Sequence, residues 1–306
     1  MNILMTGATG LVGTALVQAF TAEGHVIYRL VRPGSTRKET ISGVFDIPWS
    51  PAAGENLVFP GIDSPNNIDA VINLAGAPIA DGRWSAERKA LLRSSRIDTT
   101  RALVRAMANM SPRPRVFISA SAIGYYGDRG DEVLTENSAP GTDFLATLAK
   151  EWEGEAVKAE QFGIRVVVAR LGVVLAKAGG ALPQMMMPFR FGLGGKLGSG
   201  RQWMSWIALE DVVSIIRTAL ATDSVKGAVN LVSPQPVRNA DFTRSLARAL
   251  HRPAIFAAPA FALRLAMGQM SEMILSSTRV IPQVLLKHGY EFRHTQLDEA
   301  LRAILA

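Results

Sequence analysis

The chain has 306 residues, of which 48% are hydrophobic and 19% are charged, with a net charge of +7 at pH 7. This length and composition predict a folded chain of one large domain or two lobes, and they exclude disordered and low-complexity classes. The absence of cysteine excludes disulfides, a thiolate nucleophile and cysteine-ligated zinc, while scattered Lys and Arg without an RNA-binding or recognition-helix signature argue against a nucleic-acid partner.

The first half of the chain alternates short apolar runs with helical patterns, which is typical of a parallel sheet covered on both faces. The predicted strands are 3–6, 25–31, 70–75, 115–121, 165–171 and 228–232, and the predicted helices between them are 11–23, 86–109, 144–161 and 209–222. We therefore predict an α/β fold with a doubly wound, Rossmann-type parallel sheet. Its domain is expected over 1–175, with one strand returning at about 228–232.

A second, smaller and mainly helical lobe is expected over 176–306, including a distinct tail from 254. It opens with GGALPQMMMPFRFGLGGKLGSGRQW at 179–203, whose Gly, Pro and Met content predicts a long functional loop or lid rather than a regular element. Helical patterns follow at 239–251 and 296–305.

Two further features of this lobe bear on ligands and location. Met185, Met186 and Met187 with Phe189 and Phe191 form either an adaptable apolar substrate wall or part of the core.

The apolar stretch 254–275 is interrupted by charged and polar residues and offers no clean membrane span. Since no signal-peptide pattern precedes the first strand, we expect a cytoplasmic protein without a membrane partner.

The strongest motif lies at residues 2–16, NILMTGATGLVGTAL, where an apolar strand runs through three glycines into an amphipathic helix. Gly7 permits the tight turn, Gly10 lets the backbone approach a pyrophosphate, and Gly13 lets helix and strand pack closely. The helix N-terminus offers N–H donors and a partial positive charge to the anion. The segment thus predicts a dinucleotide site, with Thr9, Leu11 and Val12 also contacting the cofactor.

The end of the second strand indicates which dinucleotide is bound. NAD sites commonly place Asp or Glu there for the ribose 2′-hydroxyl, whereas a 2′-phosphate calls for Arg. Here the strand ends in Arg32, and no carboxylate follows until Glu39. Arg32 either binds the 2′-phosphate through two hydrogen bonds or is an ordinary surface Arg. The absence of an acidic residue at this position favours NADP(H).

Further segments carry a resemblance to a known family. TGATGLVG, then NLAG at 73–76, then SASAIGYYG at 119–127 occur in the order of the extended short-chain dehydrogenase/reductase superfamily. With SSRIDTTRAL, RLGVVL, GSGRQWMSWI and RVIPQVLLKHGYEF, the whole chain resembles a nucleotide-sugar-epimerase-like branch of it, called epimerase-family proteins. The resemblance implies an NADP(H) site that includes Leu74, Ala75, Gly76, Arg96 and Ser119. Arg96 taken alone is more often a solvated helix residue, and only the resemblance makes a cofactor contact equally expected.

Catalysis is where the chain departs from this superfamily. Active relatives use a Tyr four residues before a Lys, with a Ser or Thr that polarises the substrate oxygen. Residues 142–162 contain no Tyr, so the dyad is missing. The candidates that remain are Ser121, Tyr125 and Tyr126, and the two tyrosines are as well explained by packing in a loop.

Two functions follow from this pattern. The chain is either an NADP-dependent oxidoreductase or epimerase acting on a small molecule with a substituted acid, or an NADP-binding regulator without turnover. Fold analogy allows a monomer or a homodimer through the long helices. The four histidines are too far apart in the sequence to suggest a metal site.

Overall fold

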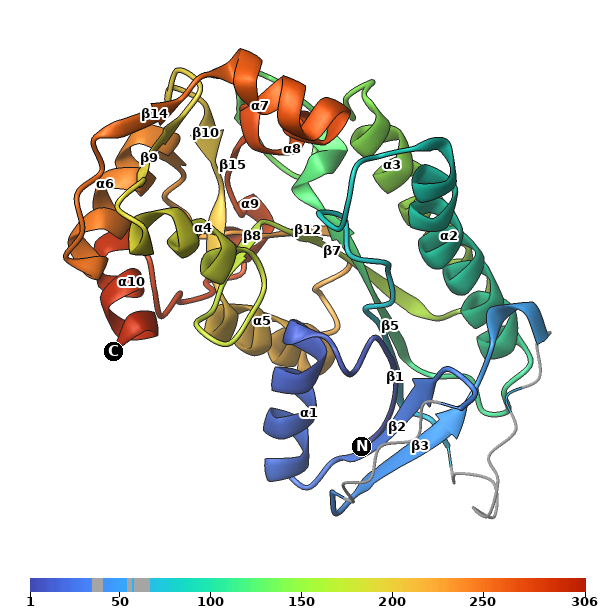
Figure 1. Ribbon diagram of the computed structural model, residues 1–306. Helices are drawn as coiled ribbons and strands as arrows, with labels where there is room; N and C mark the ends of the chain where they lie inside the picture. Colours follow the sequence, from blue (N-terminus) through green and yellow to red (C-terminus); the bar gives the residue numbers. More distant parts are fainter. Residues whose placement is uncertain (35–40, 54–56, 58–66) are drawn as a thin grey trace.

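The computed structural model describes residues 1–34, 41–53, 57 and 67–306. Seven parallel strands form its central sheet in the order β12-β7-β5-β4-β1-β2-β3 (Figure 1). In chain order these strands are β1 (Asn2–Thr6), β2 (Val26–Val31), β3 (Val44–Pro48), β4 (Ala70–Asn73), β5 (Val116–Ala122), β7 (Arg165–Leu171) and β12 (Gly227–Leu231).

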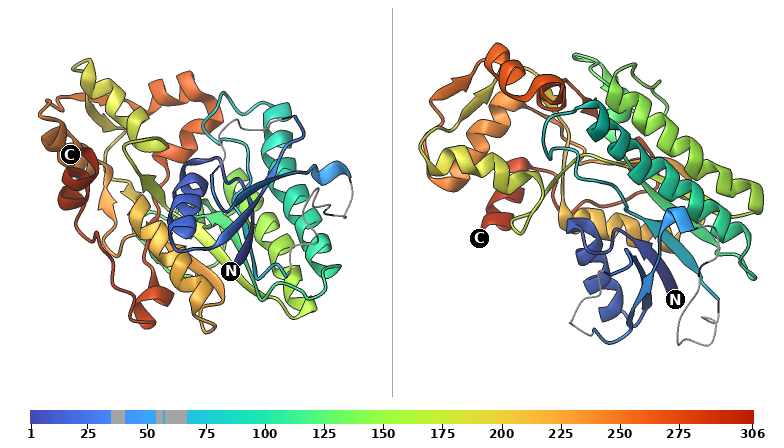
Figure 2. Two further views of the ribbon diagram at one scale, coloured as in Figure 1. Left: turned by 90° about the horizontal axis from the view of Figure 1, so that it is seen from below. Right: turned by 45° about the vertical axis from the view of Figure 1, so that its right-hand side comes forward.

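Helices cover both faces of the sheet because its strands are apolar on both sides (Figures 1 and 2). Helices α1 (Leu11–Ala22) and α5 (Leu209–Ala221) pack on one face. Helices α2 (Ala86–Ala108) and α3 (Phe144–Ala156), the latter extended by the 3-10 turn η3 (Val157–Phe162), pack on the other. This is the doubly wound architecture that the sequence predicts, and the prediction is confirmed.

The strand order reverses between β1 and β4, since β2 and β3 lie on one side of this pair and β5, β7 and β12 on the other. Ligands of open α/β sheets bind at the carboxyl ends of the strands at such a switch point. The glycine loop follows β1 and the NLAG segment ends β4. The topology therefore brings the two predicted binding segments together.

The second lobe packs beside the carboxyl ends of the sheet strands (Figure 1). Its core includes Trp206, Phe242 and Leu301. The short strands outside the central sheet pair as β8 with β11, β9 with β14, β10 with β13 and β6 with β15, so two of the pairs join the lobes. The remaining elements of the chain are β6 (Val133–Leu134), β8 (Val173–Leu175), α4 (Ala181–Arg190), β9 (Gly195–Leu197), β10 (Trp203–Met204), β11 (Trp206–Ala208), β13 (Val237–Arg238), α6 (Asn239–Leu250), β14 (Phe256–Ala258), α7 (Ala260–Met267), α8 (Glu272–Leu275), β15 (Arg279–Val280), α9 (Gln283–Lys287) and α10 (Leu297–Leu305), with 3-10 turns η1 (Pro51–Ala53), η2 (Ile123–Tyr126) and η4 (Gly268–Ser271).

Two of the differences from the sequence prediction concern α4 and β3. The segment 179–203 was expected to be irregular, but it contains α4, whose Leu182, Met186 and Phe189 recur at helical spacing and are buried. The edge strand β3 was missed, because its short run carries Asp46 and ends in Pro48 and therefore gives a weak strand signal. The lobe boundary near 175 stays a prediction. No helix in the described part of the chain is both long and apolar enough to cross a membrane.

Candidate cofactor and active site

The glycine loop between β1 and α1 packs so tightly that two of its three glycines have no room for a side chain. A Cβ on Gly7, whose φ is +64°, would lie 2.4 Å from the Leu74 carbonyl oxygen. A Cβ on Gly13 would lie 2.3 Å from the Gly7 carbonyl oxygen. At Gly10 the nearest atom would be 3.4 Å away, and Gly10 is exposed. Gly7 and Gly13 therefore serve backbone packing, whereas Gly10 leaves open space in front of the loop.

The N-terminus of α1 faces that open space with its backbone donors. Gly10 is the N-cap residue, no side chain caps the helix, and its first turn holds no acidic residue. The first-turn N–H groups of an α-helix lack intrahelical acceptors and carry a partial positive charge. The segment fits a pyrophosphate, as the sequence predicts for Thr9, Leu11 and Val12 as well.

Arg29 of β2 and Arg32, which follows this strand, differ in role. Arg29 is buried, and its Nε donates to the Asp46 carboxylate of β3 at 2.6 Å, so it ties two strands together. Arg32 directly follows β2 and is exposed. This places a guanidinium where the adenosine ribose of a bound dinucleotide is expected. Glu39, the next carboxylate in the sequence, lies outside the described residues.

Arg96 lies beneath the loop that follows β4. Its Nη2 donates to the Ala77 carbonyl oxygen at 3.0 Å and its Nη1 to the Leu92 carbonyl oxygen at 3.1 Å, while the guanidinium stands over the Trp152 ring. A Cβ on Gly76 would lie 2.9 Å from its Cζ. Burial, helped by the charge of Arg88, lowers the pKa of Arg96 to about 10. The hydrogen-bond partners of this buried cation are neutral carbonyl groups, so an anionic ligand nearby would stabilise its charge.

A buried polar network holds the strand ends beneath this site. The Asn73 side chain accepts from Thr6 at 2.7 Å and donates to Thr100 and Ser119, and its Oδ1 also accepts from the Ala75 backbone. Ser119 is 1% exposed. The structure thus places the predicted cofactor contacts Leu74, Ala75 and Gly76 in the loop itself, whereas Ser119 supports that loop from below.

The predicted catalytic Ser121 belongs to a second buried network. Its hydroxyl donates to Glu153 Oε1 at 2.6 Å, and Glu153 forms an ion pair with Arg170 at 2.7 Å. Burial alone would lower the pKa of Arg170, but the hydrogen bonds and charge of Glu153 outweigh it and raise the pKa above its usual value. Sequence reasoning missed this pair. The available signal was a carboxylate, Glu153, seven residues after Ala146 on the apolar face of α3.

The two candidate tyrosines are separated by the fold. Tyr126 is fully buried, donates to Asn230 at 2.7 Å and accepts from Arg170 at 2.9 Å. Burial raises the pKa of Tyr126 to about 12, although Arg170 opposes the shift. This interior position fits the packing alternative for Tyr126, and a catalytic role of Tyr126 stays an untested prediction. Tyr125 is half-buried, with the Arg170 guanidinium 3.5 Å from its ring centroid.

Helix α3 carries no substitute for the missing dyad. Its interior side presents Leu148 and Ala149, whereas Lys150 is exposed to solvent. Leu145 packs against η2, where a Cβ on Gly124 would lie 3.3 Å from the Leu145 Cβ. Helix α3 therefore presents neither a Tyr nor a buried Lys to the sheet, and its polar contact with β5 is made by Glu153.

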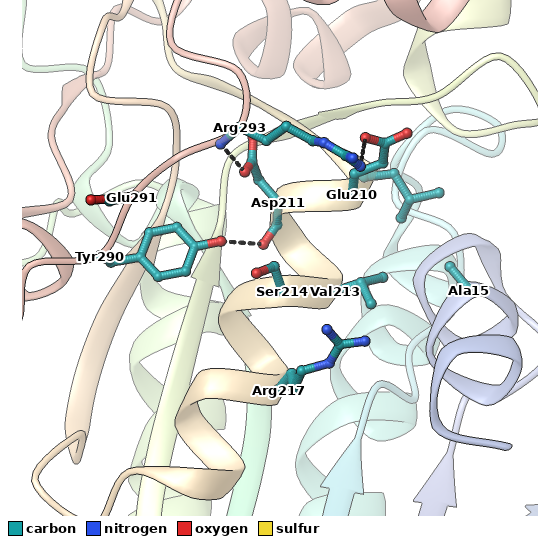
Figure 3. A pocket seen from close by; sticks show the side chains of 10 residues that line it. Ala15, Glu210, Asp211, Val213, Ser214, Arg217, Tyr290, Glu291 and Arg293 are labelled. Carbon is teal, nitrogen blue, oxygen red and sulfur yellow. Dashed lines mark hydrogen bonds and ion pairs between the residues drawn. The ribbon is translucent and has the colours of Figure 1, made fainter. Parts of the chain in front are cut away.

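A polar cavity of about 500 Å³ lies apart from these groups, between α1, α5 and the segment 290–293 (Figure 3). The buried Asp211 carboxylate accepts the backbone N–H of Arg293 at 2.8 Å and of His294 at 3.1 Å. Burial raises the pKa of Asp211 despite these bonds. Glu210 pairs with the Arg293 side chain. These contacts attach the C-terminal segment to α5, and no group of metal-ligating side chains occurs in the described residues.

Comparison with known proteins places the geometry in context. The model of the NAD dependent epimerase/dehydratase family matches residues 3–231, and a domain of unknown function, DUF1731, matches 258–304. The "Epimerase family protein ML0860" of Mycobacterium leprae is 40% identical over 300 residues, which cover 98% of this chain and 94% of that protein.

Solved structures agree. Human epimerase family protein SDR39U1 (isoform2), solved with NADPH, has a TM-score of 0.86 and 31% identity, covering 100% of this chain and 99% of that one. The UDP-glucuronic acid 4-epimerase of Bacillus cereus, with UDP-glucuronic acid and NAD, has a TM-score of 0.78 at 17% identity, covering 100% and 98%. The second likeness concerns the fold alone.

Proposed function

The chain belongs to the NAD dependent epimerase/dehydratase family, as its motifs predict, and from this premise we propose that it binds NADP(H) and acts as an epimerase-like or oxidoreductase-like protein on a small molecule. The observation that carries the proposal is the glycine loop, whose open space and uncapped α1 N-terminus fit a pyrophosphate. Arg32 at the end of β2 and the NADPH in the similar human structure support NADP(H) over NAD(H).

The chain's own residues have separate roles in this proposal. Gly7, Gly10 and Gly13 form the pyrophosphate cradle with the backbone of Leu11 and Val12. Leu74 and Ala75 lie along the adenosine side, and Arg96 offers a positive charge beneath Gly76. The cofactor supplies a hydride donor or acceptor when bound.

Proton transfer is the step for which this chain needs a substitute. A hydride delivered to a carbonyl leaves an alkoxide that must be protonated. Tyr125 is the candidate, because it follows β5 and is only partly buried, while the stacked Arg170 fixes its ring. Ser121 holds Glu153 and thereby positions Arg170.

The first prediction tests cofactor choice. Arg32→Ala is expected to weaken NADPH binding about tenfold or more, because a charge-assisted hydrogen bond to the 2′-phosphate is lost. Titration of the purified protein with NADPH and with NADH, followed by nicotinamide fluorescence, measures both affinities. NADH lacks the 2′-phosphate and serves as the internal control, so its affinity should stay within about twofold. Equal losses for both cofactors would remove Arg32 from the phosphate site, and a wild-type chain that binds neither would overturn the proposal.

The second prediction concerns Tyr125. With NADPH-saturated protein and a panel of aldehydes, ketones and sugar nucleotides, Tyr125→Phe is expected to lower kcat on any accepted substrate about 100-fold while leaving NADPH affinity unchanged. The matched exchange Tyr126→Phe removes a buried hydroxyl instead, so it should lower the thermal midpoint before it lowers kcat. If Tyr125→Phe retains turnover, a group other than Tyr125 protonates the alkoxide.

A non-catalytic NADP-binding regulator is the second candidate function. The specific observation in its favour is the α3 surface, which presents Leu148 and Ala149 inward and Lys150 outward. Such a protein binds NADPH and NADP but never exchanges the nicotinamide hydride with any substrate. Incubation with deuterium-labelled NADPH and the same substrate panel separates the two functions, since only an enzyme transfers the label. A cytoplasmic location and a monomer or homodimer remain part of the proposal.

A further inference from the structure

Large apolar side chains are exposed on two segments of the second lobe. Thirteen such residues are exposed in the described part of the chain, and seven of them fall within residues 187–193 and 255–265. We call these seven residues the apolar rim. They are Met187, Phe191, Leu193, Ile255, Phe256, Phe261 and Leu265. Exposed apolar residues that are grouped in this way mark an interaction surface.

The two segments of the apolar rim lie side by side. Strands β9 and β14 pair in parallel, and the backbones approach so closely that a Cβ on Gly195 would lie 1.7 Å from the Phe256 carbonyl oxygen. The Phe256 N–H donates to the Gly194 carbonyl at 3.2 Å. Helix α7 continues directly from β14, after Pro259, at the top of the molecule in Figure 1. The pairing thus brings the end of the first segment, near Leu193, next to Phe256 in the second segment, and α7 continues from there.

Helix α7 presents its apolar residues outward and contains no buried residue. Phe261 is 73% exposed and Leu265, one turn later, 79%. The helix end is attached to the Rossmann lobe, because Arg83 donates to the Leu265 and Ala266 carbonyl oxygens. Lys89 also donates to Gln269 of η4. These contacts hold the outward orientation of Phe261 and Leu265.

The stretches of sequence that carry the apolar rim, 161–209 and 242–271, contain no Asp or Glu, and the exposed Glu272 of α8 follows directly after the second stretch. The same stretches supply exposed cations that flank the apolar rim, namely Arg190, Lys196, Arg252 and Arg264. Exposed apolar side chains flanked by four cations complement an anionic lipid surface, in which apolar side chains enter the acyl boundary while Lys and Arg meet the headgroups.

We propose that the apolar rim docks the protein on the surface of an anionic lipid bilayer. A second copy of the chain is a poorer occupant, because a twofold interface brings the same patch together from both copies and sets the cations against one another. The expectation of no membrane partner rested on the lack of a spanning segment, which does not bear on surface docking. This role is additional to the proposed NADP(H) function.

The test uses the full chain saturated with NADPH and two sets of vesicles, one of phosphatidylcholine and one of phosphatidylcholine with phosphatidylserine. Co-sedimentation should show binding to the second set, weakened by added salt. Phe261→Ser with Leu265→Ser should lower the partition coefficient about tenfold or more, because two large apolar side chains no longer enter the bilayer. NADPH affinity should be unchanged, which separates this inference from the cofactor site.

Leu286→Ser is the matched control, because Leu286 is 47% exposed on α9, outside the apolar rim. It should leave vesicle binding intact. No binding to phosphatidylserine vesicles, or equal binding by the Phe261/Leu265 variant with its fold intact by circular dichroism, overturns the proposal. A dimer in light scattering that the same substitutions dissociate, without vesicle binding, would assign the apolar rim to self-association instead.

Discussion

Alanine at Gly13 is expected to lower the free energy of unfolding by about 3 kcal/mol or more and to abolish NADPH binding. The new Cβ would meet the Gly7 carbonyl oxygen at 2.3 Å and the Ala8 Cα at 2.6 Å. Both are backbone atoms of the glycine loop, so the clash is relieved only when α1 moves away from β1 or the loop changes conformation. Chemical denaturation measures the first effect and NADPH titration the second.

Two further glycines provide the controls for Gly13→Ala. Gly154 lies within α3, and a Cβ there would meet nothing within 4 Å. Gly154→Ala should therefore stabilise the protein by about 0.5–1 kcal/mol, since alanine favours the helix. Gly10→Ala should leave stability nearly unchanged while weakening NADPH binding, because its Cβ occupies the open space of the cradle. If Gly13→Ala folds as stably as the wild type and binds NADPH, the tight approach of loop and helix is not required.

Arg170→Met is the second substitution with a large expected effect, a loss of about 3–5 kcal/mol of unfolding free energy. The Arg170 side chain is 4% exposed and donates to both Glu153 carboxylate oxygens, to the Tyr126 hydroxyl and to the Glu136 carbonyl. Methionine fills similar space but leaves the Glu153 carboxylate nearly buried without its cation. Desolvation of that unpaired charge dominates the loss.

The matched control is Arg244→Met, which removes an exposed ion pair with Asp241 on α6. It should change stability by less than about 0.5 kcal/mol, because solvent screens the pair. Adding Glu153→Leu to Arg170→Met should recover part of the stability, since the uncompensated charge is then gone. If Arg170→Met costs no more than Arg244→Met in chemical denaturation, the buried pair contributes little, and its burial has been misjudged.

Local sequence was sufficient for the elements nearest the cofactor site. The strand ending at Thr6, the glycine triplet and the helix from Leu11 are specified within about fifteen residues by propensity, glycine conformation and periodicity. The doubly wound fold and the family follow from such segments in order and are confirmed by the structure and the comparisons. The individual site residues stay predictions until cofactor binding is measured.

Long-range packing decided what the sequence left open. Nothing in SAIGYYG distinguishes Tyr125 from Tyr126, but Asn230 and Arg170, which arrive from β12 and β7, enclose the second phenol and leave the first half-exposed. Packing also separates the Met and Phe residues of 185–191. Met186 and Phe189 of α4 are buried, whereas Met187 and Phe191 are exposed to solvent.

The sequence alone thus determined the nucleotide-binding architecture of this protein, because a strand, a glycine turn and an amphipathic helix depend on residues close together in the chain. Tertiary structure alone decided which polar groups are buried, that Glu153 and Arg170 form a pair, and that strands β9 and β14 lie side by side. These properties depend on burial and on contacts between distant segments, such as Tyr126 and Asn230, which are 104 residues apart, and sequence periodicity does not encode such contacts.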